Sequence, residues 1–130
     1  MLTQTKKTHL SDLHFEHKLW MNELGFAAEE LLIYEHYLED LVKRHSEKEM
    51  LAALEHFQNQ FIKEKNVMAH LRHDIRTSEH QLVEFAKKHP ESYDEYNLED
   101  HRDLNGRMEV FRKIFGELKA RFYQFMIDWK

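Results

Sequence analysis

Residues 10–41 read LSDLHFEHKLWMNELGFAAEELLIYEHYLEDL, and this stretch decides the fold. Large apolar side chains return at alternating steps of three and four residues, which places them along one side of a helix. With Leu10 as position a of a heptad, the a and d positions are Leu10, Leu13, His17, Trp20, Leu24, Ala27, Leu31, Tyr34, Leu38 and Leu41. An unbroken seam of this length predicts one long helix that needs partner helices to cover it.

A second apolar row follows the opposite side of the same predicted helix. Its members are Phe15, Leu19, Phe26 and Ile33. At ~100° per residue they lie roughly 140–200° from position a, so partner helices on the seam leave them uncovered. We predict an interface at this row, used by a second copy of the chain in a dimer or by another helical protein. The alternative is a bend at Gly25 that buries the row within the same chain, although the seam crosses Gly25 in phase.

The connections are predicted from changes of phase and from capping signals. Beyond residue 45 the apolar positions leave the heptad phase, and residues 46–49 have the form of a capping box, so the chain is expected to reverse there. Pro90 ends the second predicted helix, because the residue before a proline avoids the helical conformation. A second capping box at residues 92–95 is expected to start the third helix.

The sequence therefore predicts one all-α domain, an elongated up-down-up antiparallel three-helix bundle similar in shape to a spectrin repeat. The domain spans residues 1–130, with helices at about 9–44, 47–88 and 92–128. The runs HFEHKLWMNEL (14–24) and EHFQNQF (55–61) resemble a family of short uncharacterised bacterial helical proteins. That resemblance implies a helical fold and no particular activity.

Composition limits the classes of function. Of 130 residues, 42% are hydrophobic and 33% charged, with three Gly, one Pro and no Cys, which is typical of a helical globular protein. No apolar run approaches the ~20 residues of a membrane span, and residues 1–9 lack the apolar core of a signal peptide. The lack of Cys excludes disulfides and thiolate sites and fits a reducing cytoplasm, where we expect the protein to act.

Nucleic acid is not an expected partner. The formal net charge is −5, whereas nucleic-acid binders present a basic face. The densest basic stretch, within residues 112–121, is interleaved with phenylalanines of the predicted core, so its charges are interpreted as a solvated flank. The sequence has no Gly-rich phosphate loop, no nucleophile elbow and no alternation of strands with helices, which favours a non-enzymatic protein.

The histidines suggest an alternative function. Eleven are present, and the predicted helix levels gather most of them at one end of the bundle. His14, His17 and His101 lie on or beside the seams, and imidazole is a common ligand of divalent transition metals. The spacing argues against a metal site, because no Glu-x-x-His, Asp-x-x-His or His-x-x-x-His pair occurs. Without a metal, histidines on the buried side would destabilise the core when protonated between about pH 5 and 7.

Two polar residues, Glu64 and Ser78, fall on the seam of the second predicted helix. We expect the carboxylate of Glu64 to extend outward to solvent or to pair with a base such as Arg112. A buried polar residue can also fix helix register and oligomeric state. No partner acid or pocket is evident around Glu64 in the sequence, so a catalytic role is not predicted.

The leading prediction is a non-enzymatic helical interaction, scaffolding or regulatory protein that has no cofactor and acts through protein–protein contacts. As a regulatory subunit, it would exchange its homodimer for another partner on the same helical face. The alternative is a bundle that binds a divalent transition metal or a small ligand at its histidine-rich end.

Overall fold

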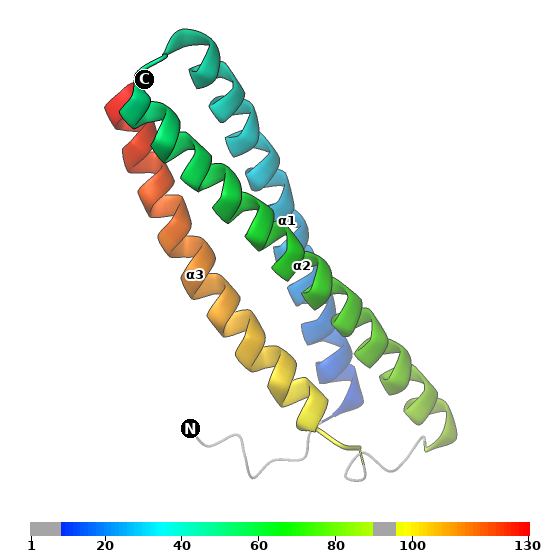
Figure 1. Cartoon of the computed structure of the whole chain (residues 1–130). Coiled ribbons are helices and arrows are strands. Elements are labelled where there is room, and N and C mark those ends of the chain that lie inside the picture. The colour runs from blue at the N-terminus through cyan, green and yellow to red at the C-terminus, as the bar shows by residue number, and fades with distance from the viewer. Residues whose placement is uncertain (1–8, 90–95) are drawn as a thin grey trace.

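The computed structural model describes residues 9–89 and 96–130 and folds them into three long helices. The helices are α1 (Leu10–Arg44), α2 (Lys48–Lys88) and α3 (Glu99–Trp129). Figure 1 shows α1 and α3 running in one direction and α2 in the other, with the carboxyl terminus beside the turn between α1 and α2. α2 packs against both of its neighbours. The predicted all-α, up-down-up three-helix architecture is confirmed.

The predicted seam of α1 is the buried side of that helix. Its ten buried residues are the ten a and d positions of the sequence pattern. The helix continues through Gly25 without a break. A Cβ atom added at Gly25 would have no neighbour within 4 Å, so the glycine serves no close helix contact. α1 therefore presents one interior side along its whole length.

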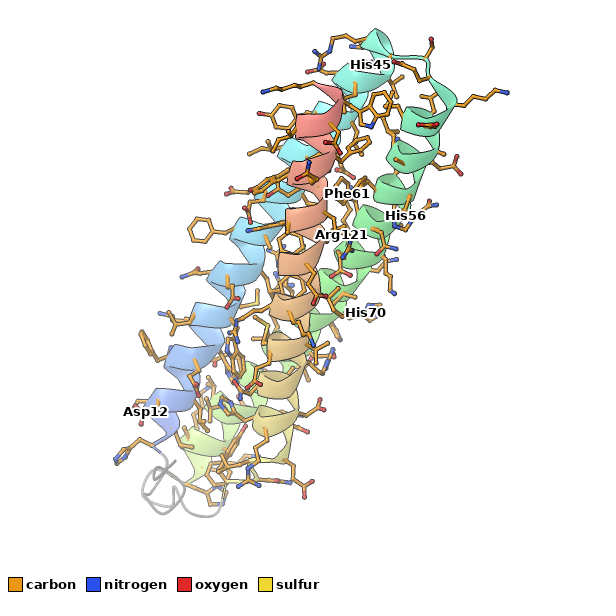
Figure 2. All side chains as sticks on the ribbon, turned by 90° about the vertical axis from the view of Figure 1, so that its left-hand side faces the viewer. Asp12, His45, His56, Phe61, His70 and Arg121 are labelled. Carbon is orange, nitrogen blue, oxygen red and sulfur yellow. The ribbon has the colours of Figure 1, made fainter. Side chains whose placement is uncertain are left out.

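Aromatic rings fill the part of the core that lies towards the α1–α2 turn. Phe61 of α2 is fully buried. Figure 2 shows it between the helices, whereas His56 and His70 project from the outer side of α2. The Phe61 ring centroid lies 5.3 Å from that of Phe122 on α3 and 6.1 Å from that of Tyr34 on α1. These separations are typical of favourable aromatic pairs, and each helix contributes one of the three rings.

A buried polar layer divides the apolar core into two parts. The larger cluster begins at Trp20 on α1 and extends towards the α1–α2 turn. A smaller cluster at the opposite end has three buried members, Leu10, Leu13 and Leu82. His17 and Ser78, both buried, lie on the seams between the two clusters. The end of the bundle where α1 begins thus has only a small apolar core.

The first connection lies where the sequence places it, but its capping differs from the prediction. Three residues separate α1 from α2, and the last of them, Glu47, is the N-cap of α2. The Glu47 carbonyl accepts the backbone N–H of Leu51 at 3.0 Å, and no side chain caps the helix. The backbone N–H of Ser46 donates to the Glu47 carboxylate at 3.0 Å. The predicted capping box is therefore wrong, because Ser46 lies one residue too early to bond the first turn.

The third helix begins at Glu99, later than the predicted start near residue 92. Residues 96–98 are not helical, and the predicted capping box at 92–95 lies outside the described residues. The side-chain oxygen of Asn97 accepts the backbone N–H of Glu99 at 2.9 Å. This bond satisfies a free donor at the start of the helix, and so it favours a start at this point.

Candidate functional site

The outer face of α1 has a continuous row of exposed apolar side chains. Phe15 is 60% exposed, Leu19 48%, Phe26 69% and Ile33 52%. Intervals of four and seven residues align them on one side of the helix, opposite the seam that packs against α2 and α3. We name this row the outer stripe; it is roughly 27 Å long at 1.5 Å per residue. The alternative that a bend at Gly25 buries the row is wrong, because α1 is unbroken and all four side chains are exposed.

One flank of the outer stripe is held to α3 by a hydrogen bond and two ion pairs. Three glutamates at seven-residue intervals on α1 each reach a basic side chain of α3. The pairs are Glu16–His101 at 2.7 Å, Glu23–Arg112 at 2.6 Å and Glu30–Lys119 at 3.2 Å. The last two pairs advance by seven residues on both helices, so α1 and α3 are parallel and in register. This flank of the outer stripe therefore contacts α3 of the same chain.

The other flank has two charges that make no ion pair within the described part of the chain. They are Lys18 and Glu29, both exposed. Relative to Phe15, helical geometry places them roughly 40–60° to the same side. The midpoint between Phe15 and Ile33 is residue 24, so Lys18 precedes the midpoint by six residues and Glu29 follows it by five. The two charges are therefore of opposite sign and almost symmetric about the centre of the outer stripe.

At the histidine-rich end, two imidazoles of α1 converge on one carboxylate of α2. The Nδ1–H of His17 donates to Oε1 of Glu79 at 2.8 Å, and Nδ1 of His14 contacts the other oxygen of the same carboxylate. His17 is buried whereas His14 is exposed. With Nδ1 as the donor, Nε2 of His17 is a buried nitrogen without a hydrogen-bond partner. Glu79 thus fixes the orientation of both rings.

His101 approaches the same layer from α3. Its Nε2–H donates to Glu16 at 2.7 Å, and its ring stacks on Trp20 with the centroids 4.9 Å apart. The centroid of His17 lies 5.5 Å away. Burial lowers the pKa of His101, while the bond to Glu16 opposes that shift. The neutral imidazole is consequently favoured in the folded protein.

The structure gives no support to the predicted metal site at His14, His17 and His101. The described residues contain no group of three or more His, Asp, Glu or Cys side chains placed to hold a metal ion. The spacing of His14 and His17 does bring them together, but the carboxylate of Glu79 occupies the position where their ring nitrogens meet. His101 is turned towards Glu16 instead. The sequence could not reveal this outcome, because it depends on the relative rotation of three helices.

Glu64 also differs from its expected environment. It is only 2% exposed, and Ser78, the other polar residue on the α2 seam, is 6% exposed. The expected pairing with Arg112 does not form, because Arg112 donates two hydrogen bonds to Glu23, at 2.6 and 3.0 Å. The expected extension into solvent is wrong as well. Burial raises the pKa of Glu64. This effect outweighs that of the nearby positive charge of Lys63, which lowers the pKa.

Comparisons of the chain with models of protein families, with curated proteins and with solved structures give no match. The resemblance to short bacterial helical proteins therefore stays a prediction. Across residues 9–89 and 96–130, no helix combines the length and the apolar character needed to cross a membrane.

Proposed function

We propose that this protein is a helical interaction module that self-associates through the outer stripe of α1 and acts by contact rather than by catalysis. The exposure of the outer stripe carries the proposal, because aligned large apolar side chains on an outward helix face are typical of interaction surfaces. A twofold dimer would cover both copies of the stripe at once, since its interface uses the same surface twice. We place this role in the cytoplasm, in keeping with the lack of Cys.

The charges beside the outer stripe favour a second copy in antiparallel orientation as the occupant. A twofold axis perpendicular to α1 near residue 24 reverses the helix direction and keeps each flank on its own side. Lys18 of one copy then meets Glu29 of the other, and the contact occurs twice. Phe15 of one copy likewise lies level with Ile33 of the other. The two ends of the outer stripe and the two flanking charges thus each have a counterpart in the same arrangement.

The test is the molar mass in solution as a function of protein concentration, by sedimentation equilibrium. An interface built on one helix face is smaller than the ~800 Å² per partner of a standard interface, so we expect dissociation in the micromolar range. Phe26→Glu should give a monomer across the range. Ile127→Glu is the matched control, because Ile127 is 62% exposed on α3 and away from the outer stripe. The control should dimerise as the wild type does.

A charge exchange tests the orientation. Lys18→Glu alone should weaken the dimer by roughly threefold to tenfold, because two like-charged pairs then form. Lys18→Glu combined with Glu29→Lys should restore the wild-type dissociation constant. A wild-type protein that stays monomeric at about 1 mM would rule out self-association. A dimer that tolerates Phe26→Glu would move the interface away from the outer stripe.

A further inference from the structure

A groove of about 920 Å³ lies between α2 and α3, and α1 contributes no residue to its lining. Its walls are largely apolar, formed by Val67, Val110, Phe111 and Ile114. The large aliphatic side chains of Val110 and Ile114 are exposed to solvent. The volume is within the range of ~300–1,000 Å³ that is typical of small-molecule sites. The groove is therefore large enough for a compact organic ligand.

Gly106 keeps the α3 side of this groove open. A Cβ atom at this position would meet no other atom within 4 Å. The backbone of Gly106 is helical and its φ angle is negative, so an ordinary side chain would be tolerated there. Glycine in the middle of a helix lowers stability relative to alanine. A larger side chain at position 106 would therefore fill part of the groove.

Glu64 of α2 lines the same groove. Glu64 is 2% exposed and has no hydrogen bond or ion pair with any other described residue. Isolated buried carboxylates are strongly disfavoured unless a donor or a cation compensates them. Burial raises the pKa of Glu64 for the same reason. The Glu64 oxygens are not among the described buried atoms that lack a hydrogen-bond partner, so they are in contact with solvent. The groove thus contains a carboxylate that no other described residue pairs.

The basic side chains around the groove do not supply that donor. Arg107 donates to Asp74 at 2.8 Å and lies 3.7 Å from Asp103. The Nδ1–H of His70 donates to the backbone carbonyl of Asn66 at 2.8 Å, and the His70 side chain is exposed. Lys63 and Arg102 also line the groove, and both are exposed, so water and salt screen their charges. Among the described residues that line the groove, Glu64 is therefore the only buried ionisable one.

We propose that this groove binds a small amphipathic cation, an amine or amidine on a compact apolar body. Its cationic nitrogen would donate to the carboxylate of Glu64, and its apolar body would lie against Val67, Val110 and Ile114. A charge-assisted bond in a desolvated place is stronger than a neutral one, which favours a cation over an alcohol. An anion would meet a buried carboxylate of like charge, and that arrangement is unfavourable.

The probe is 4-phenylbutylamine, titrated into the full chain at pH 7 by isothermal calorimetry. Its uncharged and anionic counterparts, 4-phenylbutanol and 4-phenylbutyrate, have the same apolar body. We expect the amine to bind at least about tenfold more tightly than either counterpart. Affinity for the amine should decline as the pH falls towards 4.5, because Glu64 must be ionised to accept the bond.

Two variants locate the site. Glu64→Gln should weaken amine binding by at least about tenfold, whereas Glu55→Gln, at an exposed position of α2, should leave it unchanged. Gly106→Trp should abolish binding by filling the groove. Unchanged helicity by circular dichroism shows that each variant is folded. The proposal is overturned if the amine does not bind at millimolar concentration, if the alcohol binds equally well, or if Glu64→Gln retains full affinity.

Discussion

Replacing the buried carboxyl of Glu64 by an apolar group is expected to stabilise the protein at neutral pH. Glu64→Met keeps the length of the side chain and removes its charge. A buried polar group without a partner costs about 1–3 kcal/mol, and the groove beside Glu64 leaves it partly hydrated. We therefore expect the free energy of unfolding to rise by about 1–2 kcal/mol. With an unfolding entropy of about 0.3 kcal/mol/K for a chain of this length, the melting temperature should rise by about 3–7 °C.

The pH dependence shows whether the charge is the cause. Because burial raises the pKa of Glu64 above its ordinary value of 4.5, ionising the carboxyl is less favourable in the folded state than in the unfolded state. Above the folded pKa, the wild type is therefore destabilised by the buried charge. Below pH 4.5 the carboxyl is protonated in both states, and this destabilisation is absent. The advantage of Glu64→Met should be largest at pH 7 and smaller near about pH 4, where protonation has removed the charge.

The assay is urea unfolding followed by circular dichroism at both pH values. Glu55→Met, on the exposed side of α2, is the control and should change stability by less than about 0.5 kcal/mol. Two results would refute the reasoning. One is a loss of stability in Glu64→Met at pH 7. The other is an advantage of equal size at both pH values, which would make packing rather than charge the cause.

Two further predictions concern α1 and the polar layer. Gly25→Ala should raise the free energy of unfolding by about 0.5–1 kcal/mol, because the added methyl group meets no neighbour and alanine is the better helix former. Thermal melting tests this prediction, and a lower melting temperature would contradict it. Burial lowers the pKa of His101 below its ordinary 6.5, so the wild type should lose stability as the pH falls from 6.5 through the folded pKa. His101→Phe removes that group, and Trp20 still offers a face on which the new ring can stack. The melting temperature of the variant relative to that of the wild type should therefore be higher at pH 5 than at pH 7.5. An equal difference at both pH values would count against burial of a neutral imidazole.

The interior of α1 could be predicted because it follows from the chain alone. Each of its ten buried positions, including the polar His17, is fixed by a seven-residue pattern and the rotation per residue. The exposed outer stripe follows from the same arithmetic. The course of the chain through Gly25 was likewise predictable, since the apolar pattern keeps its phase on both sides of the glycine.

The contacts between helices could not be predicted in the same way. The sequence offers Arg112 to both Glu64 and Glu23, and the choice depends on the register between α1 and α3. The i, i+3 spacing of His14 and His17 places them on one side of α1, but the identity of their partner, Glu79, depends on the rotation of α2. The start of α3 was misplaced for a local reason, because the bond from Glu99 to Asn97 has no strong sequence signature.

The polar layer at His17 and Ser78 has a consequence for how the bundle opens. Cooperative unfolding propagates through contiguous apolar contacts, and this layer interrupts them between the large cluster and the small one at Leu10, Leu13 and Leu82. We therefore expect the first turns of α1 and the last turns of α2 to form a separate, weaker cooperative unit. Their amide hydrogens should exchange with solvent through partial openings that leave the aromatic half of the bundle closed. The protein thus has one end that can open and reclose while the outer stripe beyond Trp20 keeps its shape.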